Sequence, residues 1–345
     1  MTNPKRARAK EISQATLLMN LISGKYLSQA ISVAAELGVA DVLGNGVKSA
    51  AEIAAAVNAS EDGVYRLMRA LASVGLFKPS DKRKFKLTPL GKLLRRDSVT
   101  SVRGFSCLIG HNSTWLPWGD LRHSVRTGEP AFDHVFGVPI FEYLGKTPEA
   151  SAVFDAAMTS LSTFESTAVV NACNLSRIGT IVDIAGGRGY LIAAILKANR
   201  KTRGILFDLP HVTSGAAELL RERGVAARCE IVSGDFFTSV PDGADAYIMK
   251  HIIHDWDDER AAQILRTCHR AMPSGARLLL VDVVIPTGNG LPYGKLLDLE
   301  MLVMTPRGRE RTREEFRDLL KQSGFRLTRV TPTSTYLSVV EAIKA

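Results

Sequence analysis

The spacing of apolar and polar residues divides the chain into two regions. Up to about residue 175, apolar residues recur mainly at helical spacing, as in LSQAISVAAELGVADVLG over residues 27–44. From Gly179 onward, short apolar runs such as TIVDIA, GILFDL and ARLLLVDVVI alternate with helical stretches. This alternation predicts an α/β fold with a doubly wound, mostly parallel sheet. The last two strands have no helix between them, so we expect an antiparallel edge.

The first hundred residues have the outline of a winged helix. Ser49 and Glu52 form a capping-box pattern at one helix start, and Ser60 precedes the helical run EDGVYRLMRALASVG. The run LFKPSDKRKFKLT then predicts a two-stranded ribbon. We expect a winged-helix domain at 1–100, a helical connecting region at 101–175 and an α/β domain at 176–345. The linker between domains is placed within residues 160–178.

The charge of the chain is concentrated in its first hundred residues. The net charge is +9, and residues 1–100 carry 16 basic and 8 acidic residues of the 44 and 35 in the whole chain. A basic winged helix makes a DNA-binding regulator with a ligand-sensing domain the alternative interpretation. Against it, the predicted recognition helix opens with Glu61 and Asp62, which would face the phosphates. We therefore do not expect a nucleic-acid partner.

Other features of the composition favour a cytoplasmic protein. No apolar stretch reaches the 18 residues of a membrane span, and the apolar run LLMNLI near the N-terminus is too short for a signal peptide. The four cysteines are scattered and form no CxxC motif, so neither a disulfide framework nor a zinc site is expected from them.

Acidic residues stand at the ends of three successive predicted strands. Asp183 is followed by the small-residue turn AGGRG, which lets a ligand approach the backbone at a helix N-terminus. Asp208 ends the next strand, where a carboxylate can accept hydrogen bonds from both hydroxyls of a ribose. Asp235 and Phe236 end the third, where an acid and a ring can hold an adenine. Together the three strand ends suit an adenosine ligand better than any one of them alone.

The fourth strand leads into the run MKHIIHDWDDE. It delivers His254 to the carboxyl end of the sheet, where ligands bind in open α/β folds. His251 and His254 are three residues apart, but no third metal ligand stands at a plausible spacing, so we expect no metal. His251 is interpreted as a structural residue.

In these motifs the chain resembles the S-adenosylmethionine-dependent O-methyltransferases that act on plant phenolics and in bacterial natural-product (secondary) metabolism. The matching strings, in order, are IVDIAGGRG, LFDLPHV, GDFF, MKHIIHDWDDE, VDVVIP and GRERTREEF, and the match covers about residues 15–345. The resemblance implies a Rossmann-like class I methyltransferase domain with a seven-stranded sheet. It also implies an N-terminal winged-helix domain that forms a homodimer, S-adenosylmethionine as cofactor and S-adenosylhomocysteine as product.

The resemblance assigns roles residue by residue. For the cofactor they are Asp183, Gly186 and Gly187 at the methionine end, Asp208 and Leu209 at the ribose, Asp235 and Phe236 at the adenine, and Lys250 on the strand before the catalytic turn. His254 is the implied general base, with Asp255 beside it and Glu310 supporting it. Family members often have a glutamate where this chain has Asp282, and Ala185 replaces the first glycine of the usual GGG.

The implied reaction is chemically reasonable for a phenol acceptor. A phenol has a pKa of about 10 and a histidine about 6.5, so full proton transfer would be uphill by roughly 5 kcal/mol. A carboxylate on the other imidazole nitrogen raises the pKa of the base and fixes its tautomer. Glu310 is the candidate for that carboxylate.

The acceptor itself is not named by the sequence. The residues expected to line its pocket are Trp115, Phe154, Met158, Asp298, Met301 and Met304. Methylation of a carbon or nitrogen atom, or non-methylating chemistry with the same cofactor, remains an alternative.

Overall fold

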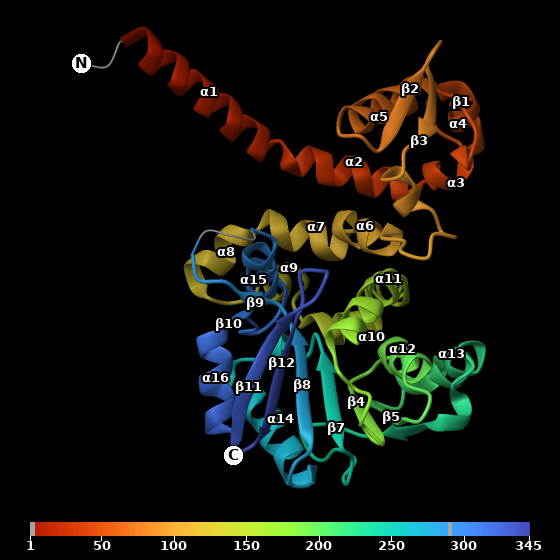
Figure 1. Ribbon diagram of the computed structural model, residues 1–345. Coiled ribbons are helices and arrows are strands. Elements are labelled where there is room, and N and C mark those ends of the chain that lie inside the picture. The colour runs from red at the N-terminus through yellow and green to blue at the C-terminus, as the bar shows by residue number, and fades with distance from the viewer. Residues whose placement is uncertain (1–3, 289–291) are drawn as a thin grey trace. The chain divides into compact units, whose positions relative to one another are not determined.

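A computed structural model describes residues 4–288 and 292–345, which form two compact units (Figure 1). The N-terminal unit spans Met1–Trp115 and Glu149–Ser160, and the C-terminal unit spans Leu116–Pro148 and Leu161–Ala345. Helix α11 (Pro148–Ala172) contributes to both. As far as Ala172, a continuous helix therefore replaces the linker predicted within 160–178.

The N-terminal unit has the expected winged-helix elements. They are α1 (Pro4–Ile22), α2 (Gly24–Glu36), α3 (Val39–Leu43), β1 (Lys48–Ser49), α4 (Ala50–Ala56), α5 (Glu61–Ser73), β2 (Phe77–Ser80), β3 (Lys84–Leu87), the 3₁₀ helix η1 (Gly91–Leu94) and α6 (Arg103–Gly110). The predicted capping box is confirmed, since Ser49 and Glu52 each accept from the other's backbone N–H. Ser60 caps α5 through Gly63 N–H. The ribbon has a third strand, because β1 pairs with β3 in the order β1-β3-β2.

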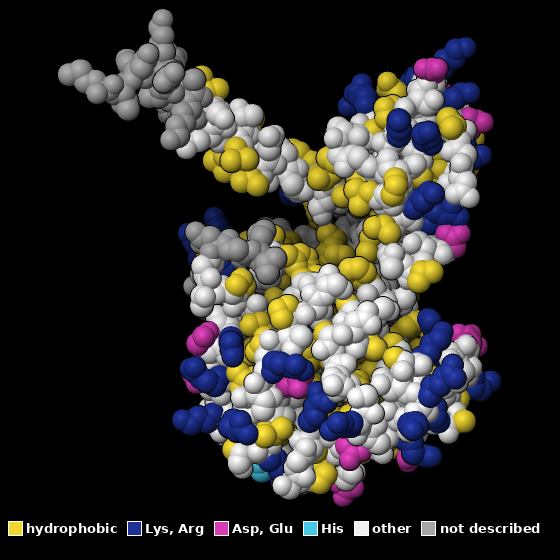
Figure 2. Space-filling model, viewed as in Figure 1, with side chains coloured by type: hydrophobic (Ala, Val, Ile, Leu, Met, Phe, Trp, Pro, Cys, Tyr) yellow, Lys and Arg dark blue, Asp and Glu magenta, His cyan; other side chains and the backbone are white. Residues whose placement is uncertain are grey.

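Helices α1 and α2 carry apolar side chains that nothing in their own unit covers. Leu18, Met19, Leu21, Ile22 and Tyr26 are each more than half exposed. Figure 2 shows apolar side chains gathered along this helical arm. A run of exposed apolar residues of this length is typical of a surface that another polypeptide covers.

The basic residues of the ribbon are solvated. Lys82, Arg83 and Lys84 surround the turn between β2 and β3 and are exposed, as Figure 2 shows for the Lys and Arg side chains of this unit. Arg83 also lies within 4 Å of Glu61 and Asp62 and packs over the Tyr65 ring. The acids that open α5 therefore neutralise part of the basic ribbon.

The C-terminal unit is built on a seven-stranded sheet of described residues. Its strands are β4 (Thr180–Ile184), β5 (Arg203–Asp208), β6 (Cys229–Ser233), β7 (Ala246–Lys250), β8 (Arg277–Asp282), β11 (Phe325–Pro332) and β12 (Ser338–Lys344). Their order is β11-β12-β8-β7-β4-β5-β6. The pairs from β8 to β6 are parallel, and β12 is antiparallel to both neighbours, so the predicted antiparallel edge is confirmed.

Helices cover both faces of this sheet (Figure 1). They and the remaining short elements are α7 (Asn112–Gly119, shared with the other unit), α8 (Leu121–Thr127), α9 (Ala131–Phe136), α10 (Ile140–Lys146), α12 (Tyr190–Ala198), η2 (Thr213–Gly215), α13 (Ala216–Glu222), η3 (Ala226–Arg228), η4 (Ile253–Asp255), α14 (Asp258–Ala271), β9 (Val284–Ile285), α15 (Pro292–Met304), β10 (Arg311–Thr312) and α16 (Arg313–Gln322).

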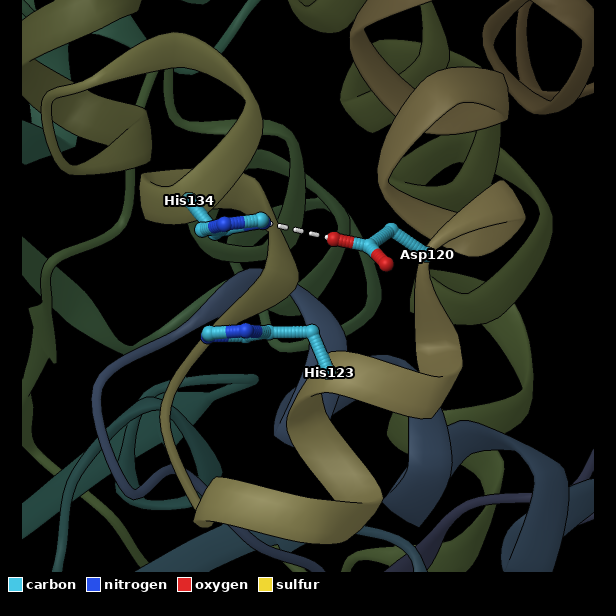
Figure 3. Close-up of side chains that lie close together, drawn as sticks. All are labelled: Asp120, His123 and His134. Carbon is cyan, nitrogen blue, oxygen red and sulfur yellow. Dashed lines mark hydrogen bonds and ion pairs between the residues drawn. The ribbon is translucent and has the colours of Figure 1, made fainter.

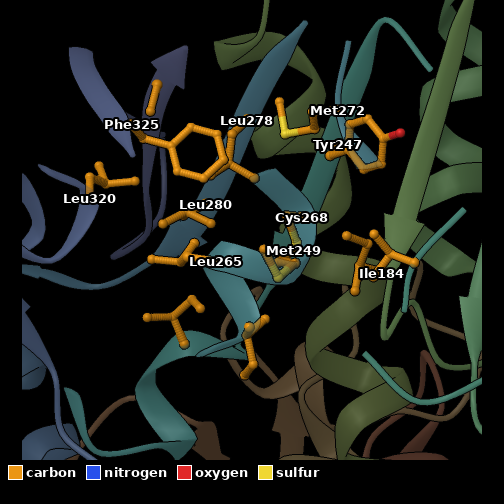
Figure 4. Close-up of a cluster of buried hydrophobic side chains, with 14 of the residues drawn as sticks. Ile184, Tyr247, Met249, Leu265, Cys268, Met272, Leu278, Leu280, Leu320 and Phe325 are labelled. Atoms are coloured by element: carbon orange, nitrogen blue, oxygen red, sulfur yellow. The ribbon is translucent and has the colours of Figure 1, made fainter. Parts of the chain in front are cut away.

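Alternate residues of each strand enter two separate cores. Tyr247 and Met249 of β7 pack with α14 and α16, whereas Ile248 packs on the opposite face with α12 and α13. Figure 4 shows the first of these cores, in which Leu265 and Cys268 of α14 meet β7 and β8. Central strands buried on both faces explain why the sequence shows continuous apolar runs there rather than alternation.

The strand order places the edge of the sheet where a site is expected. The chain runs outward through β4, β5 and β6 and then returns to β7, which pairs with β4 on its other side. Ligands bind in open α/β sheets at such a reversal, outside the carboxyl ends of the strands. The motifs singled out from the sequence follow β4, β5, β6 and β7 at this edge.

Among the described residues, no helix is long and apolar enough to cross a membrane.

Candidate active site

A histidine and a glutamate distant in sequence meet beyond the end of β7. His254 lies on η4, and its Nδ1 is 2.7 Å from Oε1 of Glu310. Both side chains are buried. Because a carboxylate only accepts hydrogen bonds, it fixes a proton on Nδ1, so the neutral form of His254 has its lone pair on Nε2. The structure thus brings together the base and the supporting carboxylate that the sequence predicts.

A small parallel ladder and one buried arginine hold this pair in place. Strand β10 pairs with β9, the continuation of β8, and so fixes Glu310 next to the end of β8. The guanidinium of Arg311 donates to the carbonyls of Ile253 and Trp256, each at 2.9 Å, and to Asp258. The backbone N–H of Arg309 donates to the His254 carbonyl at 2.7 Å. The segment GRERT therefore anchors the histidine turn as well as supplying its carboxylate.

The electrostatic environment makes His254 a strong base. Burial would lower its pKa, but the carboxylates of Glu310 and Asp255 outweigh burial and raise the pKa to about 10. Asp255 lies 3.5 Å from His254 Nε2, and burial raises the pKa of Asp255 to about 6. The raised pKa of His254 is close to that of an ordinary phenol.

Asp282 ends β8 close to both histidines and is almost fully buried. Burial raises its pKa to about 8, and neither carboxyl oxygen has a hydrogen-bond partner among the described residues. A ligand atom of Asp282 and one of each of His251 and His254 lie within 4.8 Å of one another. The sequence showed no third candidate metal ligand near the two histidines, and in the structure the neighbouring strand β8 supplies one, Asp282.

Sequence reasoning missed Glu165, on helix α11. Its buried carboxylate accepts from Lys250 Nζ at 2.8 Å, from His251 Nε2 at 3.1 Å and from the hydroxyl of Tyr336. The positive partners outweigh burial and hold the pKa of Glu165 well below its usual range. Lys250, for which the resemblance implies a contact with the cofactor, thus has its partner on α11 in this structure.

One signal could have drawn attention to Glu165 in the sequence. It is an acidic residue in the otherwise uncharged stretch from Met158 to Ser176, and a charge inside an apolar helix is rarely buried without a partner. This signal does not identify the partner, because Glu165 and His251 are 86 residues apart. Only the structure shows that His251 has a positive φ of 57°, a conformation that non-glycine residues adopt rarely and mostly where surroundings enforce it.

The turn after β4 is tight, and a side chain at Gly186 would clash there, whereas Gly187 is constrained only by its positive φ of 61°. A Cβ on Gly186 would lie 2.5 Å from a Leu206 methyl and 2.7 Å from the Asp183 carboxyl, whereas a Cβ on Gly187 would meet nothing within 4 Å. Asp183 accepts from Ile192 N–H at 3.2 Å, and burial raises its pKa to about 7. The surface beside Gly187 is therefore open, as close approach of a ligand requires.

The ends of β5 and β6 present the other two acids. Asp208 accepts from Gly187 N–H at 2.8 Å and from Leu209 N–H at 2.7 Å, so it joins the β4 turn to the β5 end. Burial raises the pKa of Asp208. Asp235 accepts from Phe237 N–H at 2.8 Å. The Phe236 ring packs against Phe237 and Trp256.

The structure divides the predicted acceptor-pocket residues between the two units. Trp115, Phe154 and Met158 belong to the N-terminal unit, where Lys25 Nζ lies 5.1 Å from the centre of the Trp115 ring. Asp298, Met301 and Met304 lie on α15 of the C-terminal unit. Asp298 accepts from the Glu310 N–H at 2.9 Å. Asp298 therefore supports the position of the carboxylate that holds His254.

The fold and this site together define a Rossmann-like α/β enzyme with a carboxylate-supported histidine at the topological switch of its sheet. Comparison with known proteins then gives the family. Residues 118–326 match the O-methyltransferase domain, and residues 19–97 match the O-methyltransferase dimerisation domain. The chain belongs to the S-adenosylmethionine-dependent O-methyltransferase family, as the sequence motifs predict.

Similar proteins come from bacterial natural-product biosynthesis. The phenazine O-methyltransferase PhzM of Lysobacter antibioticus is 43% identical over 99% of both chains. The O-demethylpuromycin-O-methyltransferase of Streptomyces alboniger is 41% identical over 94% of this chain and 88% of its own. The solved structure of the mitomycin 7-O-methyltransferase MmcR superposes with a TM-score of 0.88 at 38% identity, covering 98% of this chain and 100% of its own.

The family match also bears on the role of the N-terminal unit. The winged helix matches a module that assembles two methyltransferase chains, which supports a homodimer. The exposed apolar arm of α1 and α2 is the kind of surface that such assembly requires.

Proposed function

We propose that this enzyme methylates a phenolic hydroxyl of an aromatic small molecule, with His254 as general base. The observation that carries the proposal is the buried His254–Glu310 pair at the switch point of the sheet, with the pKa of His254 raised to about 10. Once His254 is neutral, a base whose pKa matches that of the acceptor makes transfer of the phenol proton nearly isoenergetic instead of uphill.

Methyl transfer from a sulfonium is an in-line displacement of sulfur by oxygen. As the oxygen–carbon bond forms and the carbon–sulfur bond breaks, the phenol proton passes to Nε2 of His254. Glu310 stabilises the resulting imidazolium through Nδ1–H. S-adenosylmethionine leaves as S-adenosylhomocysteine, which carries no sulfonium charge.

We propose that the cofactor binds along the carboxyl ends of β4, β5 and β6. The methionine part would lie beside Gly187, where the surface is open. The ribose would bind Asp208 at the end of β5, and the adenine would bind Asp235 and Phe236 at the end of β6. Asp183 supports the turn, and Leu209 flanks the ribose. Lys250 would contact the cofactor from beside Glu165.

The acceptor class follows from the relatives. Similar proteins are named for 3-amino-4-hydroxybenzoate, for 2,7-dihydroxy-5-methyl-1-naphthoate and for a phenazine, all flat aromatic molecules. We propose the same class here, with Met301 and Met304 as adaptable pocket walls and Trp115, Phe154 and Met158 contributed by the helical region. Within the predicted domain limits of 1–100, 101–175 and 176–345, we propose that the middle region shapes this pocket. We also propose that the enzyme acts in the cytoplasm, without nucleic-acid or membrane partners.

Two measurements on the full-length protein test the proposal. Calorimetric titration with S-adenosylhomocysteine should show binding in wild type that Asp208→Ala weakens at least tenfold. Initial rates on a panel of hydroxylated benzoates, naphthoates and phenazines should identify an acceptor, and His254→Ala should lower kcat by about 10² to 10⁴ with cofactor binding retained. An active His254→Ala enzyme would remove the general-base role.

N-methylation is the second candidate. One relative is named as an N,N-dimethyltransferase of 8-amino-8-demethylriboflavin and is 32% identical over 98% of this chain. An aromatic amine acceptor in the same panel distinguishes N-methylation from O-methylation. An amine attacks the methyl group before it loses its proton, so a base is needed only afterwards, when that proton has become acidic.

A further inference from the structure

Residues at the ends of β7 and β8 also have the side-chain types and spacing of a metal site. His251, His254 and Asp282 each offer a ligand atom within 4.8 Å of the other two. We propose that these three side chains form a binding site for Zn²⁺, and that zinc held there inhibits the enzyme. The binding follows from the geometry alone, and the inhibition rests on the proposed function of His254.

The hydrogen bonds of both histidines leave the right nitrogen free. Zinc-bound histidines almost always donate their other N–H to a carboxylate, which fixes the tautomer and the ring. His254 has Glu310 on Nδ1 at 2.7 Å, and His251 has Glu165 on Nε2 at 3.1 Å. Because carboxylates only accept, His254 Nε2 and His251 Nδ1 are the nitrogens left for a metal ion. Near neutral pH the ion would displace the proton that the raised pKa of His254 keeps on Nε2, so binding should strengthen as pH rises.

The distance between the rings agrees with a tetrahedral zinc ion. An ion about 2.05 Å from each nitrogen lies about 3.2 Å from each ring centre, which places the two centres about 5.2 Å apart. The observed separation is 5.1 Å, with the rings tilted by 33°. The two imidazoles thus have the spacing of a chelating pair before any ion is present.

Asp282 supplies the anionic ligand. It is almost fully buried, and both of its oxygens lack a hydrogen-bond partner among the described residues. A buried carboxyl without a partner is costly, and a cation would satisfy it.

A second cluster in the C-terminal unit provides an internal control. Asp120, His123 and His134 also offer ligand atoms within 4.8 Å, but the two rings stack face to face at 4.1 Å with an interplanar angle of 6° (Figure 3). Each lone pair lies in the plane of its own ring, and the planes of two stacked rings do not meet, so the two nitrogens do not converge on one ion. His134 is instead held by Asp120 at 2.7 Å.

Inhibition follows from what the ion would occupy. Zinc bound to Nε2 of His254 takes the lone pair that the proposed mechanism needs for the phenol proton. The ion carries no redox or Lewis-acid role in this proposal. Chelation should restore activity, because no covalent bond of the protein changes.

Zinc binding to the full-length enzyme tests the proposal, measured by competition with a colorimetric chelator. Wild type and the control His123→Gln/His134→Gln should bind one equivalent with equal affinity. His251→Gln and Asp282→Asn should each weaken this binding at least tenfold, since even outer partners of zinc ligands contribute about 10- to 100-fold. Circular dichroism checks that each variant is folded. If His251→Gln does not fold, the test rests on Asp282→Asn.

Two further readouts separate this proposal from the proposed function. Co²⁺ in place of Zn²⁺ should give visible absorption bands typical of nitrogen and oxygen ligands, lost in His251→Gln. Zinc should inhibit methylation of the best acceptor of the panel, with at least tenfold more zinc needed for His251→Gln relative to its own uninhibited rate. Binding that survives in both His251→Gln and Asp282→Asn, or that is lost in the His123/His134 control, would overturn the zinc site whether or not methylation is observed.

Discussion

The two carboxylate-bound histidines that flank the end of β7 have opposite electrostatics. Each imidazole contacts one buried glutamate, His254 through Glu310 and His251 through Glu165. Yet the pKa of His254 is raised to about 10, whereas burial lowers the pKa of His251. The same pair of side-chain types therefore produces a strong base in one place and a neutral imidazole in the other.

The cause is how each glutamate's charge is shared. Glu165 also accepts from Lys250 and Tyr336, and the ammonium of Lys250 opposes a second positive charge on His251. Glu310 has no cation of this kind: its Oε2 lacks a partner among the described residues, and Asp255 adds a further negative charge beside His254. A carboxylate raises the pKa of a histidine only to the extent that its charge is not already neutralised.

Of the changes that test the difference between the two histidines, removing the charge of Glu310 should have the largest effect on activity. Glu310→Gln keeps the shape but removes the anion that stabilises the imidazolium and fixes its tautomer. We expect kcat to fall by about 10² to 10⁴ with little change in S-adenosylhomocysteine binding. Initial rates and calorimetry measure both, and a kcat within threefold of wild type would contradict the role of Glu310.

The pH dependence of kcat/KM sharpens the same point. Only neutral His254 accepts a proton, and a raised pKa keeps it protonated up to about pH 10. We therefore expect kcat/KM to rise with pH between 7 and 9, by at most about tenfold per unit. In Glu310→Gln the pKa of His254 falls, so this rising limb should move to lower pH. A limb that stays in place or moves upward would show that another group controls it.

The Glu165 cluster should show its effect in stability. Glu165→Gln leaves Lys250 buried without its anion and weakens the hydrogen bond from His251, and breaking a buried ion pair in this way costs about 3 to 5 kcal/mol. Urea unfolding monitored by circular dichroism measures the loss. Because the folded-state pKa of Glu165 is lowered, the stability it contributes is present above its unfolded pKa and is lost as pH falls below that value.

Tyr336→Phe is the matched smaller change in the same cluster. It removes one hydrogen bond to the Glu165 carboxylate and leaves all charges in place. We expect a loss of about 1.5 to 3 kcal/mol in the free energy of unfolding, less than for Glu165→Gln. Equal losses in the two variants would mean that charge on Glu165 contributes little.

The smallest expected effect concerns backbone strain, which is present at both His251 and Ala185. Both have positive φ, 57° and 53°, at the ends of the adjacent strands β7 and β4. Ala185→Gly relieves this strain and should stabilise the protein by about 1 kcal/mol. His251→Gly relieves similar strain but loses the Glu165 contact, so it should destabilise. Thermal unfolding measures the change in stability of each variant. If both variants were more stable than wild type, the His251 side chain would contribute nothing to stability.

Local signals predicted the architecture well. Strand and helix periodicity, the capping box at Ser49 and the absence of a helix before β12 gave the α/β fold, its antiparallel edge and the winged helix. The ordered motifs gave the family and pointed to His254 and Glu310. These features depend on residues near one another in the chain or on strings specific enough to recognise.

Tertiary structure alone decided the partners. Glu165 reaches His251 across 86 residues, Asp282 comes beside the histidines from the next strand, and α11 continues where a linker was expected. Whether Lys250 neutralises Glu165, and so whether His251 becomes a base, depends on which charges the fold buries together. Sequence spacing determines which face of an element a residue occupies, but the contacts between elements, and therefore the pKa values, are set only when the sheet is assembled.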